Sequence, residues 1–225
     1  ETLYEITAAT TTTITVDGPA LTTETGVTLD VNEYVELSMV QVQLREDLDI
    51  VVTGQLDVTA GGESYVGSES AIELGSLNVD GNLRVRAQGE LSNGGNSAST
   101  NITSDNLVLE SGDGGIGSDG MVYVDQTVGA TLTARGTGDI NITERAGDMN
   151  INTVYSAGGD VTLVADGSIL DHNNTEFVNI EADSITLTAQ TGSIGVVGNA
   201  LEVEARGDLG DDLGLLTLTA EGDVI

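Results

Sequence analysis

Short stretches of alternating apolar and polar residues recur along most of the chain, and each ends in the same kind of corner. Leu83-Arg84-Val85-Arg86-Ala87 and Leu216-Thr217-Leu218-Thr219-Ala220 are two such stretches. A period of two places the apolar side chains on one face of a β-strand. In each corner a small residue is followed by polar residues, a glycine, one residue and an aliphatic, as in Ala165-Asp166-Gly167-Ser168-Ile169. Because helical spacing is almost absent, this pattern predicts an all-β chain.

The spacing of the corners predicts how the strands are arranged. Their small residues fall at positions 60, 87, 111, 134, 165, 189, 205 and 220, and most of the steps lie near multiples of eight. Three strand-and-turn units of about eight residues make one coil of roughly 24, which predicts a parallel β-helix, or β-solenoid. Inward aliphatic side chains would then stack in columns from coil to coil. The last two steps, from 189 to 205 and from 205 to 220, are shorter and fit poorly, so they mark either two-strand steps or narrower coils.

This coil length makes a specific prediction about register. Arg86 and Glu110 each stand one position before a corner, and one predicted coil length separates them. We therefore expect them to lie over one another on adjacent coils, as an outward-facing pair of opposite charge. Such a surface pair contributes only about 0 to 1 kcal/mol to stability, so its value is as a marker of register.

The repeats resemble those of a known class of bacterial proteins. Leu-x-Leu-x-Ala followed by Gly-x-Ile, as in Val161 to Ile169 and Ile185 to Ile194, is similar to the repeats of filamentous-haemagglutinin-type exoproteins and giant repetitive adhesins. The resemblance covers about residues 54 to 225, and it implies a right-handed β-helical shaft, exported to the cell surface, that acts in attachment, aggregation or biofilm formation. Residues 1–53 are less regular, and we expect divergent coils or an N-terminal cap-like β module there.

The charge and the scarcity of reactive side chains limit the function. The chain has 37 acidic and 6 basic residues, a formal net charge of −31. This charge disfavours binding to nucleic acid or to an anionic membrane surface, and its self-repulsion must be screened by salt or by bound cations. The chain has no Cys and a single His, His172, so few side chains suited to catalysis are present. No apolar run approaches the roughly 18 residues of a membrane helix. A non-enzymatic protein without membrane insertion is therefore favoured.

Two acidic loops are candidate calcium sites. Gly114 to Val122 matches the glycine-rich nonapeptide of calcium-binding β-rolls, and it places Asp113 and Asp119 at one loop. Only one copy is present, and it occupies the repeat position of Ser193-Ile194-Gly195, which favours an ordinary corner. The second candidate is the glycine-rich loop from Gly207 to Gly214. The candidate metal ligands are Asp113, Asp119, Asp208, Asp211 and Asp212, and Ca²⁺ is the ion that they would bind. For the second loop a solvated acidic surface is favoured over a metal site, because a cation site needs oxygens that converge on one point.

These observations favour a structural β-solenoid segment of a large secreted surface adhesin or extracellular fibre. The expected partners are flanking repeats or other copies of the chain, and components of the cell surface or extracellular matrix. Leu216 to Ile225 is expected to be an unfinished coil whose end abuts another coil, another copy of the chain or an extension of it. One alternative is a calcium-dependent binding or assembly module. The other is a polysaccharide-active β-helix enzyme, which generally needs a basic or aromatic cleft.

Overall fold

The described chain consists of strands joined by turns and short irregular segments. The structure, a computed structural model, describes residues 5–9, 14–17, 47–95, 98–173, 175–207 and 213–225. Within these residues there is no helix, and hence none that could span a membrane. The chain divides into two compact units, Glu1–Leu44 and Arg45–Ile225. In the first unit, β1 (Glu5–Ala9) and β2 (Ile14–Asp17) pair antiparallel.

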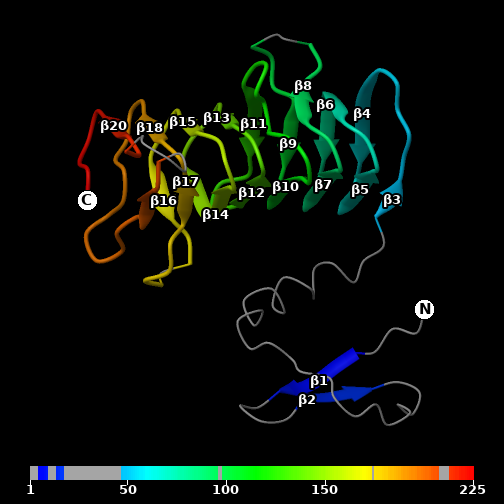
Figure 1. Cartoon of the computed structure of the whole chain (residues 1–225), viewed down its shortest axis with the longest axis horizontal. Coiled ribbons are helices and arrows are strands. Elements are labelled where there is room, and N and C mark those ends of the chain that lie inside the picture. Colours follow the sequence, from blue (N-terminus) through cyan, green and yellow to red (C-terminus); the bar gives the residue numbers. More distant parts are fainter. Residues whose placement is uncertain (1–4, 10–13, 18–46, 96–97, 174, 208–212) are drawn as a thin grey trace. The chain divides into compact units, whose positions relative to one another are not determined.

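The second unit is a β-solenoid (Figure 1). As the chain winds, its strands join two parallel sheets, for the most part in alternation. The first sheet contains β3 (Leu48–Asp49), β5 (Ser64–Ser68), β7 (Leu83–Ala87), β10 (Leu107–Ser111), β12 (Thr131–Gly136), β14 (Met149–Ser156), β16 (Ile169–Asp171), β17 (Ile180–Ala182) and β19 (Val203–Ala205). The second contains β4 (Gln55–Ala60), β6 (Ile72–Val79), β8 (Leu91–Asn93), β9 (Ile102–Ser104), β11 (Val122–Gln126), β13 (Ile140–Glu144), β15 (Val161–Ala165), β18 (Ile185–Ala189) and β20 (Leu216–Ala220). The predicted fold is confirmed.

Each strand pairs with a strand one coil later in the chain, and this pairing gives the coil length. Val161 pairs with Ile185, and this step has the predicted length. Thr131 pairs with Asn150, which is a shorter step, and Ile185 pairs with Leu216, which is a longer one. The solenoid has about seven coils of about 21 residues. The coil length varies because both the strands and the connections between them differ in length.

The irregular spacing near the C-terminus has a simple explanation. Ala189 and Ala220 pair directly on the second sheet, whereas Ala205 lies on β19 of the first sheet and pairs with Ala182. The two short steps between corners, on either side of Ala205, are therefore two successive faces of one long coil. Each step leads from one sheet to the other, so neither step is a narrower coil.

Apolar columns between the two sheets form the core. Ile142, Leu163 and Leu187 stack in register on β13, β15 and β18, and each is fully buried. Within each of these strands, the residues that alternate with the core residues point outward and are mostly threonine or other polar residues. Because every coil rests only on its neighbours, the core is long and thin, and each column continues from one coil to the next.

The predicted stacking of Arg86 and Glu110 is confirmed, but their ion pairs are offset. The two residues are register partners on β7 and β10. The carboxylate of Glu110 binds Arg84 instead, with 2.6 Å between Nη2 and Oε2. Arg86 binds Asp47, which precedes β3, with 3.1 Å between Nε and Oδ2. Arg84 also binds Asp47 and is only 5 % exposed, so this ion-pair cluster on the first sheet is largely buried.

The solenoid begins before residue 54. Leu48 of β3 pairs in parallel with Val66 of β5, so the strands of the first sheet start within the range predicted as divergent coils or a cap. The sequence around β3 lacks the alternating pattern of the later strands, which is why the repeat cannot be recognised there. Most of residues 1–53 lies outside the described residues.

Candidate functional site

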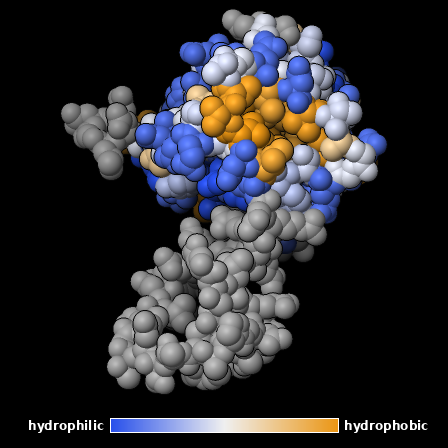
Figure 2. Space-filling view, turned by 90° about the vertical axis from the view of Figure 1, so that its right-hand side faces the viewer, coloured by the Kyte–Doolittle hydropathy of each residue, from blue (hydrophilic) through white to orange (hydrophobic). Residues whose placement is uncertain are grey.

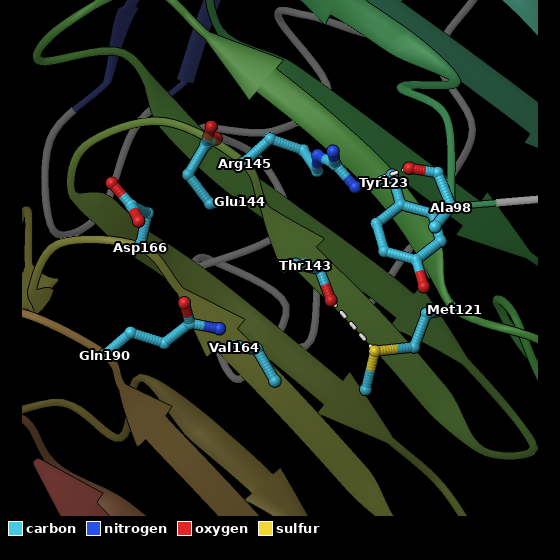
Figure 3. Close-up of a pocket in the computed structure, with 9 residues that line it drawn as sticks. All are labelled: Ala98, Met121, Tyr123, Thr143, Glu144, Arg145, Val164, Asp166 and Gln190. Atoms are coloured by element: carbon cyan, nitrogen blue, oxygen red, sulfur yellow. Dashed lines mark hydrogen bonds between the residues drawn. The ribbon is translucent and has the colours of Figure 1, made fainter.

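The outer face of the second sheet carries a hollow of about 450 Å³. It lies over β11, β13 and β15 and extends to the corner after β18, and Ala98 from the connection between β8 and β9 closes one side (Figure 3). Sites for small molecules typically measure about 300–1,000 Å³, so the hollow is large enough for one small ligand. Its lining residues are Ala98, Met121, Tyr123, Thr143, Glu144, Arg145, Val164, Asp166 and Gln190.

Arg145 is the cation of this hollow. Its guanidinium lies over the ring of Tyr123, with 5.3 Å from Cζ to the ring centroid, and Nη1 donates a hydrogen bond to the carbonyl oxygen of Ala98 (Figure 3). Three other arginines form ion pairs with carboxylates. Within the described part of the chain, no carboxylate lies at salt-bridge distance from Arg145. Because a guanidinium has five N–H donors, several of them stay free to bind a ligand.

Arg145, Asp166 and Gln190 occupy one repeat position on three successive coils. Each follows the last residue of its strand, and β13, β15 and β18 pair in register up to that residue. Neighbouring strands lie about 4.8 Å apart, so the backbones of these three residues stand at the spacing of the coils. The guanidinium of Arg145 itself turns toward Tyr123 on β11. The side chains of Asp166 and Gln190 are exposed, and neither has a hydrogen-bond partner among the described residues.

The remaining wall of the hollow is mostly apolar. Met121, Thr143 and Val164 are half-buried on the outer face of the sheet. The hydroxyl of Thr143 donates a hydrogen bond to the sulfur of Met121, with 2.8 Å between Oγ1 and Sδ (Figure 3). The hollow therefore combines an apolar floor with a few polar groups at its rim, which is typical of sites that bind small ligands.

Glu144 occupies an inward position that other coils give to aliphatic residues. It pairs in register with Val124 on one side and with Ala165 on the other. Its side chain is buried, and its carboxylate accepts hydrogen bonds from the backbone N–H groups of Gln126 (3.3 Å) and Ala146 (3.2 Å). Burial raises the pKa of Glu144 from 4.5 to about 7, with a smaller increase from the charge of Asp125, although these hydrogen bonds oppose the shift.

The raised pKa predicts a pH-dependent contribution to stability. The native state holds the Glu144 proton more tightly than the unfolded chain, so this residue's contribution falls as the pH rises from about 4.5 through 7. We expect Glu144→Gln to gain about 2 to 3 kcal/mol of unfolding free energy relative to the wild type between pH 5 and pH 8, since each pKa unit corresponds to about 1.4 kcal/mol. Urea unfolding at several pH values measures this difference.

Glu204→Gln is the matched control for this prediction, because Glu204 is exposed on β19. Glu204→Gln also removes one carboxylate from this very acidic chain. It therefore shows how much of the change in stability comes from lower charge repulsion alone. A difference between Glu144→Gln and the wild type that stays constant over the same pH range would contradict the assignment of a buried titrating carboxylate.

The sequence-predicted calcium ligands lie elsewhere. Asp113 and Asp119 are exposed on turns between β10 and β11. Between them, Ile116 is buried and forms single parallel bridges with both neighbouring coils, as Ile194 does, and Gly117 and Gly195 follow with φ of +70° and +74°. This equivalence makes residues 115–117 a corner of the core. Asp208, Asp211 and Asp212 lie outside the described residues. Among the residues that are described, no group of three or more His, Cys, Asp or Glu side chains is placed to hold a metal ion.

Comparison with known proteins identifies no relative of this chain. No protein-family model, no curated protein and no solved structure matches this chain. Any account of function therefore rests on the residues and on the fold.

Sequence reasoning did not find the hollow, although part of its signal is visible in the repeats. Asp166 and Gln190 follow the small residues of two corners, and aligning the repeats one strand earlier would have placed Arg145 in the same row. The alternation of β13 also predicts that Glu144 faces inward. Two features carry no local signal: the approach of Ala98 over the sheet, and the turn of Arg145 toward Tyr123.

Proposed function

We propose that this chain is a structural β-solenoid segment of a large secreted surface adhesin or extracellular fibre, and that it extends a rod by stacking coil on coil. The observation that carries the proposal is that the terminal coils at both ends of the solenoid expose apolar core residues. The resemblance of the repeats to those of bacterial surface adhesins supports the extracellular setting and a role in attachment or aggregation.

The first end is formed by β3 and β4. Figure 2 views the solenoid from this end and shows an apolar patch in the middle of a polar surface. Leu48 and Val51 are 66 % and 87 % exposed. Leu56 and Val58 of β4 are only partly buried, although they are register partners of fully buried or nearly fully buried leucines on β6.

The second end is formed by β19 and β20, and it is open in the same way. Leu216 and Leu218 continue the columns of Ile185 and Leu187, yet Leu216 is 41 % exposed and Leu218 is only partly buried. Further exposed apolar residues surround this end, namely Leu213, Leu215, Val224 and Ile225.

The two ends are complementary. The core residues of β4 (Leu56, Val58 and Ala60) have the same spacing and similar sizes as those of β20 (Leu216, Leu218 and Ala220). The first sheet runs from β3 to β19, and the second runs from β4 to β20. The outer edges of these four terminal strands therefore present main-chain N–H and C=O groups for pairing with another strand. Because all strands of a sheet are parallel, a second copy can continue the sheets only if its β3/β4 end contacts the β19/β20 end of the first copy. Repeating this head-to-tail contact generates an open filament.

This proposal predicts self-association of the whole chain. We expect sedimentation velocity to show concentration-dependent assemblies at about 0.5 M NaCl, where the Debye length lies between about 3 and 10 Å and repulsion between copies is largely screened. Leu218→Asp should weaken association at least about a hundredfold, because it buries an unpaired charge against the next coil.

Thr217→Asp is the matched control, because Thr217 lies next to Leu218 on β20 but faces outward and is exposed. It adds the same charge and should leave most of the association intact. Wild-type protein that stays monomeric at every concentration and salt level, or equal loss of association in both variants, would argue against coil stacking.

A further inference from the structure

We propose that the hollow over β11, β13 and β15 binds one unit of a carboxylated saccharide, a uronate, with Arg145 holding the carboxylate and Asp166 and Gln190 binding hydroxyl groups. This binding site goes beyond the structural role proposed above and does not depend on the stacking of coils. It would give the rod an attachment point on its side.

The charge of Arg145 selects a ligand with a single carboxylate. The chain carries a net charge of −31, so a polyanion would be repelled by the surface as a whole. Yet Arg145 is exposed, and among the described residues its guanidinium is held by one carbonyl oxygen and one aromatic ring, with no carboxylate partner. A guanidinium with free N–H groups binds a carboxylate through two parallel, charge-assisted hydrogen bonds.

The next two residues of the row suit hydroxyl groups. Asp166 and Gln190 stand one and two coils beyond Arg145, at steps of about 4.8 Å, and their side chains point outward from the corner (Figure 3). A carboxylate accepts hydrogen bonds only, whereas an amide both donates and accepts. A pyranose ring of a uronate carries its carboxylate and its hydroxyl groups on different carbons. Its carboxylate can therefore bind Arg145 while its hydroxyl groups bind Asp166 and Gln190.

The floor of the hollow fits the C–H face of a sugar ring. Met121 and Val164 supply apolar surface, and Tyr123 is already covered on one face by Arg145. A bound metal ion is disfavoured here, because Arg145 would repel it and the described residues offer no group of three or more suitable ligands. A nucleotide is disfavoured because its phosphates carry several negative charges and the hollow contains one cation.

The test uses methyl β-D-glucopyranosiduronate and, as the neutral probe of the same shape, its methyl ester. Binding to the full chain is measured by saturation-transfer NMR and titration at about 0.15 M NaCl with EDTA present. We expect the acid to bind and the ester to bind at least about tenfold more weakly. Arg145→Gln should weaken binding of the acid at least about tenfold, because it removes the charge-assisted hydrogen bonds to the carboxylate.

Arg86→Gln is the matched control, because Arg86 is exposed on the other sheet and its variant makes the same change in net charge. It should leave the dissociation constant unchanged, and so should Leu218→Asp, which separates this proposal from coil stacking. Gln190→Ala should weaken binding a few-fold.

Four results would each overturn the proposal: no binding of the acid, equal binding of acid and ester, unchanged binding by Arg145→Gln, or competition by acetate at the same concentration as the saccharide. The last result would mean that the hollow binds a carboxylate without recognising the sugar.

Discussion

Replacing Arg84 with alanine is expected to lower the free energy of unfolding by about 3–5 kcal/mol, because it leaves the largely buried carboxylate of Glu110 without its cation and removes one of the two cations that bind Asp47. Arg84 lies between Asp47 and Glu110, at 3.1 Å and 2.6 Å respectively. The side chain of Asp47 is only 5 % exposed and that of Glu110 is 17 % exposed. Arg86 still binds Asp47 in this variant, whereas Glu110 has no second ion-pair partner among the described residues. Chemical denaturation of the variant and the wild type measures the difference.

Two further variants separate the loss of charge from the loss of packing. Arg206→Met removes a cation from an ion pair with Glu181 whose side chains are 29 % and 31 % exposed, so it should cost only about 1 kcal/mol. Arg84→Met with Glu110→Leu should recover part of the loss, because it also removes the carboxylate that has lost its cation, while Arg86 still binds Asp47. If Arg84→Ala cost no more than Arg206→Met, the ion-pair cluster of the first sheet would contribute little to the stability of the solenoid.

Shortening a central core residue is expected to have an effect of similar size. Leu163→Ala should lower the free energy of unfolding by about 2–5 kcal/mol, because Leu163 is fully buried in its column between Ile142 and Leu187. The coils on both sides are held in register, so we expect the structure to relax only partly into the cavity. Leu218→Ala removes the same atoms from the last described strand of the same sheet, where the side chain is partly exposed, and it should cost much less.

The comparison of Leu163 with Leu218 tests the column itself. Both residues stand in the same register column of the second sheet. They differ in that Leu163 has a neighbouring strand on both sides, whereas Leu218 has one on one side only. Equal losses in the two variants would contradict the stacking of coils that the structure describes, since a solenoid's stability depends on contacts between neighbouring repeats.

The strands and their stacking could be predicted from the sequence because their signal is local. A period of two gives the inward face of each strand, and the corner residues give the points where the chain turns. The coil length is harder to predict, because a long connection such as the one before β20 adds residues without changing the strands. The stacking of Arg86 on Glu110 followed from spacing alone, whereas the burial of Arg84 depends on Asp47, which lies far away in the sequence.

The site was harder to predict than the fold for the same reason. Arg145, Asp166 and Gln190 stand in one row because three strands pair in register, and the repeats carry that information. The shape of the hollow depends instead on the connection that brings Ala98 over the sheet and on the direction in which Arg145 turns. Neither follows from a repeat pattern, because both are contacts between segments of unrelated sequence.

Mixing two variants with opposite blocked ends tests whether the solenoid extends head to tail. Val58→Asp blocks the β4 end and Leu218→Asp blocks the β20 end, so each variant alone should be monomeric. Head-to-tail stacking predicts that an equimolar mixture forms dimers and nothing larger, because only one pair of compatible ends remains. Sedimentation velocity of the mixture gives the answer. A mixture that stays monomeric, while the wild type associates, or a variant that dimerises alone, would contradict head-to-tail extension of the solenoid.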